Sequence, residues 1–222
     1  MNGHAQLFDR TSDGWKAHSP SFPVLFGKHG LAWGRGLMPG GSDGPVKVEH
    51  DNRAPAGLFR IGLIYTYDAS LPEGANYPFH QVAAGDAWVD DEQNPYYNRF
   101  VHVDPNDPPV WFGKQKMRSG DFAYHWLVEI RHNSDPPLPG FGSAIFFHIR
   151  RGVQRPSAGC TTLSKTDLIN LIRWLRADSR PEYVCLPSAE YAARWAIWGL
   201  PDPKETMLFH RSEVAAYKRA VQ

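Results

Sequence analysis

The chain reads Gly142-Ser-Ala-Ile-Phe-Phe-His148-Ile-Arg-Arg-Gly-Val-Gln-Arg-Pro-Ser-Ala-Gly-Cys160 over the stretch that decides its fold. Residues 143–149 form an apolar run without polar alternation, which predicts a central β-strand. The run ends in a histidine, and the short basic loop after it ends in a cysteine. Because a thiol is nucleophilic only as the thiolate, a nearby imidazole can activate it by accepting its proton. The stretch therefore nominates Cys160 as a nucleophile and His148 as its base.

The spacing of this pair suits a strand followed by a returning loop. His148 and Cys160 lie 12 residues apart, enough for the loop to bring its end back beside the strand. Gly159 allows backbone conformations closed to other residues, so the amides of Gly159 and Cys160 are candidates for an oxyanion hole. Ser157 could hydrogen-bond the loop or a substrate, and Arg155 could attract a carboxylate and lower the thiol pKa.

A structural interpretation of the same pair competes with the catalytic one. A histidine at the end of an apolar strand is often a satisfied core residue, and a lone cysteine is often buried. The chain's second cysteine, Cys185, fits a strand over 182–186 as a small apolar side chain. The sequence has no Cys-x-x-Cys and no His-x-x-x-His, so we predict no zinc site.

Composition excludes several classes of protein. A formal net charge of +1 over 222 residues argues against nucleic acid as a partner. The absence of an 18-residue apolar run predicts no membrane span. The N-terminus, Met1-Asn-Gly-His-Ala-Gln, lacks the features of a signal peptide. A cytosolic protein, another export route and a leader missing from this chain all stay open.

The pattern along the chain predicts a mainly β (α+β) fold. With 19 prolines and 20 glycines, short strands and loops dominate. Strands are expected at 58–65, with a bulge at Gly62, at 124–132 and at 182–186. Residues 124–132 alternate in polarity, which is typical of a half-buried strand.

Helices are expected only in the last third of the chain. Ser164 and Asp167 resemble a capping box before apolar residues at helical spacing. Ser188 could cap a second helix that runs to Trp198, with Tyr191, Ala192, Trp195 and Trp198 as its buried stripe. We therefore expect one domain over 1–200, followed by a C-terminal arm or weak helix over 201–222.

The turn-rich, aromatic segment 76–100 is long for a passive connection, and such loops are often functional. It contains Asp90 and Asp91, which suggest a metal site or an acid/base pair. Sequence neighbours seldom point the same way, so turn capping is the favoured interpretation.

The motif of residues 142–148 followed by Ser157-Ala-Gly-Cys160 resembles the L,D-transpeptidase catalytic domain. That family carries a histidine and then a Ser/Thr-x-Gly-Cys signature on a mainly β scaffold. The resemblance covers roughly residues 20 to 200, less sharply outside the motif. It extends to Lys47–Asp51, Pro55–Gly57, Trp88–Asp91, Tyr97-Asn98 and Asn133.

The resemblance implies a bacterial enzyme of peptidoglycan. Its nucleophile falls on Cys160 and its base on His148, with no cofactor. Such enzymes attack the L,D bond of stem peptides and form a thioacyl intermediate. They then pass the acyl group to an amine acceptor, to a wall-linked protein or to water. Trp88 and Ser143 join Ser157 and Arg155 as candidate substrate-binding residues, and the third catalytic member stays open between a backbone carbonyl, Ser143 and none.

One departure from the family pattern keeps alternatives open. Many members have an arginine two residues after the cysteine, where this chain has Thr162. A hydrolytic variant, either an L,D-carboxypeptidase or an amidase that cuts stem peptides or detaches wall-linked proteins, is the first alternative. The second is a non-catalytic wall-binding module that uses aromatics such as Trp88, Tyr96 and Tyr97. The expected location is the periplasm or cell wall, with a secreted effector as the other option.

Overall fold

The computed structural model describes residues 1–204 and 206. The chain divides into two compact units, one made of Met1 and residues 25–185, the other of residues 2–24 and 186–222. The expected single domain over 1–200 stays a prediction. Of the expected arm over 201–222, residues 205 and 207–222 lie outside the described residues.

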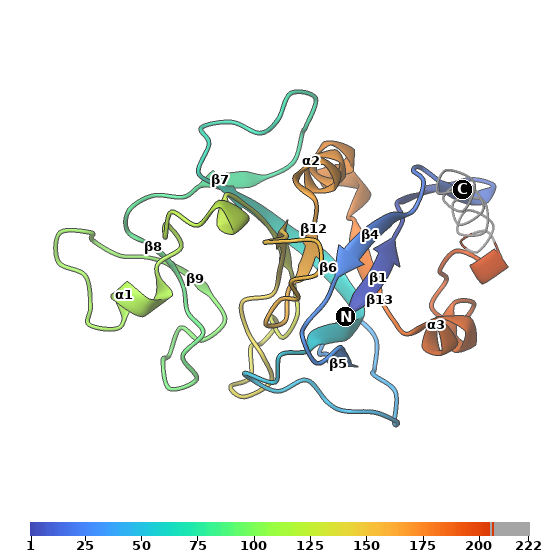
Figure 1. The fold of residues 1–222 in the computed structure, drawn as a ribbon, viewed down its shortest axis with the longest axis horizontal. Helices are drawn as coiled ribbons and strands as arrows, with labels where there is room; N and C mark the ends of the chain where they lie inside the picture. The colour runs from blue at the N-terminus through green and yellow to red at the C-terminus, as the bar shows by residue number, and fades with distance from the viewer. Residues whose placement is uncertain (205, 207–222) are drawn as a thin grey trace. The chain divides into compact units, whose positions relative to one another are not determined.

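The first unit is built on a mixed sheet, as the mainly β prediction requires (Figure 1). In spatial order its strands are β12 (Thr161–Leu163), β11 (Phe146–Ile149), β10 (Trp126–Ile130), β6 (Ala54–Thr66) and β13 (Glu182–Cys185). β11 and β12 run parallel, while the other neighbours in this series are antiparallel. The short strands β5 (Leu31–Trp33) and β7 (Phe79–Gln81) pair in parallel with opposite ends of β6. The fold prediction is confirmed.

Strand β6 is longer than the predicted 58–65 and bends where the sequence indicated a bulge. Its register with β10 shifts between the pairs Ile64–Val128 and Ile61–Ile130. A Cβ at Gly62 would lie 2.0 Å from a carboxylate oxygen of Glu129, so the absent side chain leaves room for Glu129 to cross the strand. The bulge prediction at Gly62 is confirmed.

The prediction of a half-buried strand over 124–132 is wrong in two respects. Tyr124 belongs to a short 3₁₀ turn, η1 (Phe122–Tyr124), which Asp121 caps by accepting a hydrogen bond from the Ala123 amide. The strand that follows is buried on both faces, with Leu127 and Val128 each less than a tenth exposed. Leu127 packs into a core cluster on one face of the sheet, while Val128 and Ile130 are buried on the other face.

Register assigns the side chains to the two faces of the sheet. Leu127 lies opposite both Tyr65 and His148, and His148 lies opposite Thr162, so these four side chains share one face.

The other face is covered by helix α2 (Lys165–Trp174), which packs against β11 and β12. Ser164 caps α2 by accepting a hydrogen bond from the Asp167 amide, and Leu168, Leu171 and Ile172 are buried. The helix predicted after the cysteine is confirmed.

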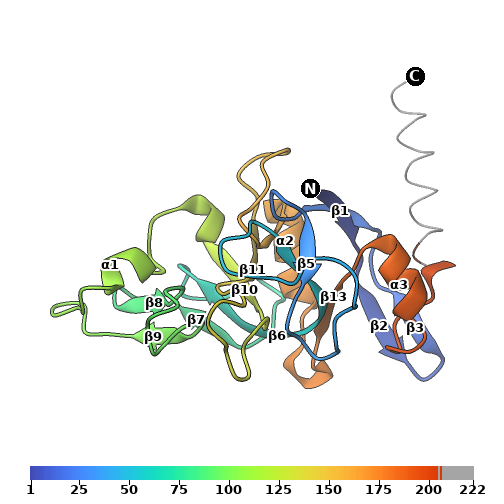
Figure 2. The same cartoon turned by 90° about the horizontal axis from the view of Figure 1, so that it is seen from below.

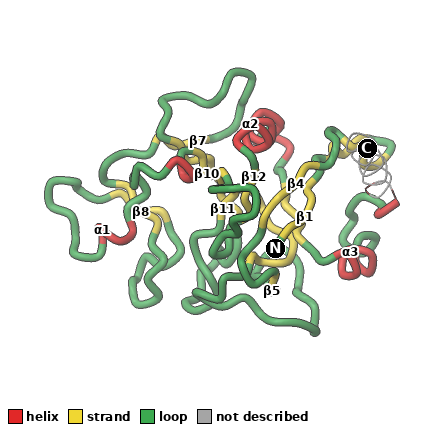
Figure 3. Tube along the Cα trace, in the orientation of Figure 1, coloured by secondary structure: helices red, strands yellow, loops and turns green. Residues whose placement is uncertain are grey.

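The long segment between β6 and β10 forms one end of the first unit (Figures 1 and 2). It carries β8 (Asp86–Trp88), β9 (Phe100–His102) and α1 (Phe112–Gln115), and most of its path is loop (Figure 3). The fully buried Asp86 carboxylate accepts hydrogen bonds from His80 at 2.6 Å and from His102 at 2.7 Å. One carboxylate thus ties β7, β8 and β9 together.

The second unit contains four strands: β1 (Asn2–Ala5), β2 (Phe8–Thr11), β3 (Gly14–Ala17) and β4 (Phe22–Leu25), whose last residue belongs to the first unit. β2 and β3 form a hairpin, and β1 is the neighbour of β4. Helix α3 (Ser188–Arg194) is shorter than predicted, begins without a side-chain cap and contains no buried residue, so the predicted Ser188 cap and buried stripe are wrong. Tyr191 instead donates its hydroxyl to the Pro201 carbonyl.

A 3₁₀ turn, η2 (Ala177–Ser179), connects α2 to β13. Across residues 1–204 and 206, none of the helices has both the length and the apolar character needed to cross a membrane.

Gly27 packs so closely against another backbone segment that no side chain fits at this position. Replacing Gly27 therefore tests the fold. A Cβ at Gly27 would lie 2.3 Å from the Asn52 carbonyl oxygen, a backbone atom that cannot rotate away. We expect Gly27→Ala to lower the free energy of unfolding by about 1–3 kcal/mol, as overpacking does. Urea denaturation measures this. The matched control is Gly113→Ala, where a Cβ meets nothing within 4 Å, and equal stability of the two variants would contradict the packing described.

Candidate active site

The parallel pairing of β11 and β12 brings Cys160 and His148 to the same face of the sheet. His148 lies opposite Thr162, and the Phe146 amide donates to Cys160 Sγ at 3.4 Å. Side chains alternate along a strand, so residues two apart share a face. Cys160 and His148 therefore lie on one face, offset by two residues along the strand direction.

The imidazole of His148 is held by a main-chain contact. Its Nδ1 lies 2.9 Å from the Ile149 carbonyl oxygen, and because a carbonyl only accepts, Nδ1 is the protonated nitrogen. Nε2 then carries the lone pair that a base needs. The ring is 3% exposed and meets the Tyr124 ring edge-on at 5.1 Å. Of the three options for the partner of His148, the backbone carbonyl is the one observed, and Ser143 does not fill that position.

Burial keeps both members of the pair neutral. It lowers the pKa of His148 from 6.5 to about 4, against the opposing effect of the Ile149 carbonyl. It raises the pKa of the Cys160 thiol from 9.0 to about 11, although the Phe146 amide and the charges of Lys47 and Arg151 act in the opposite direction. At pH 7 the resting pair is thus a thiol and a neutral imidazole, not a thiolate and an imidazolium.

The resting thiol is directed to the backbone. Cys160 Sγ donates to the Ala144 carbonyl oxygen at 3.4 Å, and no hydrogen bond joins Cys160 to His148 in the part of the chain described here. Ala144 adopts a φ of +54°, in the left-handed region that side chains other than glycine rarely enter. Such strained residues persist where their surroundings fix them, often at functional sites.

Asn98 is the residue that fixes Ala144, and the sequence did not single it out as a site residue. Its Oδ1 accepts hydrogen bonds from the Ala144 amide at 3.0 Å and from Trp88 Nε1 at 3.2 Å. Its Nδ2 donates to the carbonyls of His132 and Asn133 at 3.0 and 2.7 Å. Asn98 is itself buried, with φ +53°. It thereby links the segment after β10 to the residue whose carbonyl accepts the hydrogen bond of the Cys160 thiol.

The loop before Cys160 is organised by Ser157. Its hydroxyl donates to the Cys160 carbonyl and accepts a hydrogen bond from the Gly159 amide at 3.1 Å. Its backbone is held by Phe26 and Lys28, through bonds of 3.1 and 3.0 Å. Ser157 therefore supports the loop, one of the two roles expected for it, and the Gly159 amide already has an acceptor.

The candidate substrate-binding residues Trp88, Ser143 and Arg155 lie in different environments. Trp88 packs edge-on against Phe146 at 4.9 Å and belongs, with Cys160, to the aromatic layer on this face. Ser143 is buried, and its hydroxyl makes no hydrogen bond of good geometry within the described residues, although it lies close enough to the Tyr97 hydroxyl to influence it. Arg155 is exposed and is not among the groups that act on the thiol pKa.

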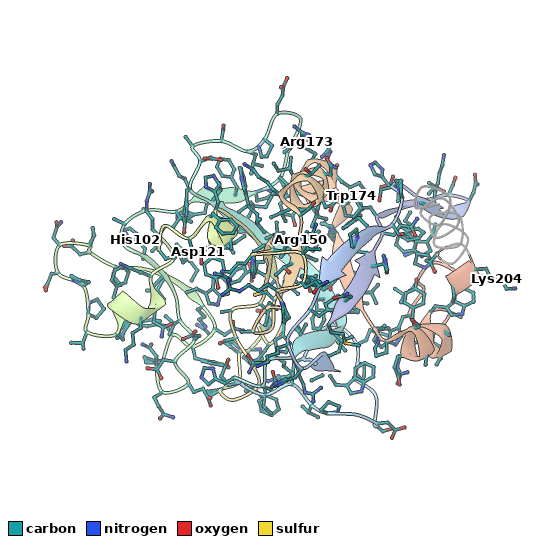
Figure 4. The ribbon with its side chains drawn as sticks, in the orientation of Figure 1. His102, Asp121, Arg150, Arg173, Trp174 and Lys204 are labelled. Atoms are coloured by element: carbon teal, nitrogen blue, oxygen red, sulfur yellow. The ribbon has the colours of Figure 1, made fainter. Side chains whose placement is uncertain are left out.

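Arg151 is the cation that accompanies the pair, and spacing did not predict it. Its guanidinium forms an ion pair with Asp121 and lies 4.8 Å from the centre of the Tyr124 ring, which contacts His148. Figure 4 marks Asp121 and Arg150, the neighbour of Arg151 at the end of β11. Thr162, at the position of the family's arginine, is 2% exposed and turns its hydroxyl to the Leu25 carbonyl, so it is a packing residue.

Two other sequence interpretations can be compared with the structure. Asp91 accepts a hydrogen bond from the Gln93 amide at 3.0 Å, which is the turn capping favoured over a metal or acid/base role. Of the aromatics offered as an exposed binding surface, Tyr96 is exposed, Trp88 is half-buried and Tyr97 is buried. The expectation that Tyr97 lies on such a surface is wrong, because its hydroxyl is turned inward to Glu49.

Comparison with known proteins agrees with this geometry. A family model, the L,D-transpeptidase catalytic domain, matches residues 20–184. The chain therefore belongs to the L,D-transpeptidase catalytic domain family, whose members are typically enzymes that act on peptidoglycan. No curated protein and no solved structure matched in the corresponding searches.

The raised thiol pKa predicts an unusual alkylation profile. In a Cys185→Ser background, Cys160 is the only cysteine, and its reaction with iodoacetamide should be slow at pH 7. Its rate should still rise about tenfold per pH unit between pH 8 and 10, because a thiol of pKa about 11 is not yet ionised there. The alkylation rate of an ordinary thiol, whose pKa is about 8.5, levels off about one pH unit above that value. A plateau below pH 8.5 would show a preformed thiolate and contradict the neutral pair.

Removal of Asn98 should loosen the carbonyl that holds the thiol. Asn98→Ala deletes four hydrogen bonds and leaves their backbone and indole partners buried, so unfolding should become easier by about 3 kcal/mol or more. Asn98→Asp keeps the acceptor for the Ala144 amide and tolerates the positive φ, but it turns a carboxylate oxygen toward the His132 and Asn133 carbonyls. It should therefore also lose stability while keeping the Ala144 contact. Urea denaturation gives the stability, and Cys160 alkylation reports on the site. If the alanine and aspartate variants match wild type in both, the positioning role fails.

Proposed function

We propose that this protein uses Cys160 for acyl transfer on peptidoglycan stem peptides, with His148 as its general base. The observation that carries the proposal is the His148–Ile149 contact. This contact leaves His148 Nε2 unprotonated, on the same face of the sheet as the Cys160 thiol. The chain that carries this pair belongs to the L,D-transpeptidase catalytic domain family. The two-step reaction needs a thiol, an imidazole and an oxyanion hole.

The first step couples proton transfer to attack. The thiol leaves the Ala144 carbonyl and gives its proton to His148 Nε2 as sulfur adds to the carbonyl carbon of the L,D bond. The tetrahedral adduct then collapses: the C–N bond breaks, the imidazolium returns the proton to the leaving nitrogen, and the terminal D-amino acid departs. A thioacyl group remains on Cys160. Because both groups start neutral, ionisation accompanies substrate binding and does not precede it.

The second step reverses these roles. An amine, or water, loses a proton to His148 as it adds to the thioester, and the C–S bond breaks with return of the proton to sulfur. For the oxyanion of both steps we propose the Cys160 amide as a donor. The Gly159 amide would join it only if Ser157 released its hydrogen bond, which is 3.1 Å long in the resting site.

The molecule that accepts the acyl group, an amine or water, decides whether the enzyme is a transferase or a hydrolase. Thr162 is buried and cannot hold a substrate carboxylate as an arginine there would. Arg151 offers one positive charge near the pair in its place, but Asp121 already engages it. We favour transfer to an amine and treat transfer to water as the alternative that product mass distinguishes. The substrate class implies action in the periplasm or at the cell wall.

Intact-mass analysis of the protein with purified muropeptides tests the proposal. Wild type should gain the mass of the acyl donor minus the terminal D-amino acid, and Cys160→Ala should gain nothing. Cys185→Ser is the matched control and should behave as wild type, because Cys185 is 4% exposed in β13. In the product, addition of an amine indicates transfer and addition of water indicates hydrolysis. If Cys160→Ala leaves the muropeptide profile the same as wild type, the enzyme assignment is wrong and a binding module becomes the better interpretation.

A further inference from the structure

A small cavity of the first unit gathers three arginines from distant parts of the sequence. It has a volume of about 180 Å³, and its walls include Arg35, Arg60, Arg131, Asn133 and Asp135. None of these residues has a role in the chemistry proposed for Cys160. We refer to this cavity as the arginine pocket.

The backbone of the arginine pocket is fixed by direct hydrogen bonds between its walls. The Arg131 amide donates to the Arg60 carbonyl at 3.0 Å, and the Asn133 amide donates to the Arg35 carbonyl at 2.9 Å. The Arg35 amide donates in turn to His132 Nδ1 at 3.2 Å. These hydrogen bonds join three segments of the chain, so the backbone positions of the three arginines are fixed relative to one another.

Several N–H donors of the three guanidinium groups have no acceptor within the described residues. Arg35 donates to Asn133 Oδ1 at 3.1 Å and lies 5.5 Å from the centre of the Phe141 ring. Arg131 donates through its Nη2 to Asp135 at 2.8 Å, but its Nε is buried without an acceptor among the residues described. Arg60 is exposed and shows no side-chain hydrogen bond or ion pair in the same part of the chain. A buried N–H without an acceptor is destabilising, so its presence calls for an explanation.

Nearby carboxylates do not balance these charges. Asp135 is the acid in the wall, and its side chain is 73% exposed. Glu129 lies near Arg131, but it is turned to the Leu63 amide and burial raises its pKa. Glu182 lies opposite Arg60 on β13, yet no ion pair joins them within the described residues. The pocket therefore holds three cations against one solvated carboxylate.

We propose that the arginine pocket binds an anionic oxygen group, either a carboxylate or a phosphate. The planar fork of a guanidinium matches the paired oxygens of such groups, and three arginines line this one small cavity. A bound anion would offset the repulsion between the arginines. The cavity suits one such group, not a whole saccharide unit. This inference does not depend on the role of Cys160.

Titration of the full-length Cys160→Ala protein tests the pocket without interference from acyl transfer. Inorganic phosphate, acetate and citrate are added in separate arms, each against sodium chloride at equal ionic strength. The readout is the side-chain Nε–H signal of Arg131, observed by NMR and assigned by its loss in Arg131→Lys. We expect phosphate, a carboxylate or both to shift this signal with saturation, and chloride to leave it unchanged. The arm that saturates at the lowest concentration identifies the ligand chemistry.

Variants of Arg60 provide the matched comparison, because its exposed side chain has no partner to lose. Arg60→Gln should weaken anion binding about tenfold or more, and Arg60→Lys, which keeps the charge but not the fork, should weaken it less. Arg10→Gln removes an equal charge from a residue outside the pocket wall and should leave binding unchanged. If chloride shifts the signal as strongly as the oxyanions, or if Arg10→Gln and Arg60→Gln weaken binding equally, the proposal is overturned.

Discussion

The parallel pairing of β11 with β12 is the constraint on which the site depends. Parallel neighbours need a crossover of about a dozen residues or more, and a helix usually supplies it. Here residues 150–160 make the crossing without a helix. Their path is fixed at Ser157, which is bonded to Phe26, to Lys28 and to its own loop. Without that support, Cys160 and His148 would not share one face at a fixed offset.

Burial shapes the chemistry of the pair as strongly as proximity does. The apolar layer around Cys160 includes Tyr65, Trp88 and Phe146, and an apolar environment disfavours the charged forms of both thiol and imidazole. The same environment strengthens hydrogen bonds to an oxyanion, because water is excluded. Under the proposed function, a resting site of this kind stays unreactive until a substrate brings its own carbonyl dipole into the layer. We infer that the protection of the thiol and its reactivity have one physical origin.

Local sequence signals predicted the parts of the fold that local physics determines. The capping residues Ser164 and Asp167 indicated α2, and Gly62 indicated the bulge, because each acts on its own segment. The motif nominated His148 and Cys160 in the same way. The burial of β10 could not be predicted, since it depends on which segments, distant in sequence, pack against the two faces of the sheet. The contacts of Asn98 and Arg151 also could not be predicted, because their partners Ala144 and Asp121 lie 46 and 30 residues away.

The contact between His148 and Ile149 has a consequence for how such sites evolve. The acceptor is a main-chain oxygen, which every amino acid carries, so substitution at position 149 leaves the acceptor in place. Selection on that side chain acts on its packing, for it is 8% exposed. The orienting group is therefore invisible to any comparison of side chains between relatives. A family can keep this geometry intact while the residue that supplies it drifts freely among apolar types.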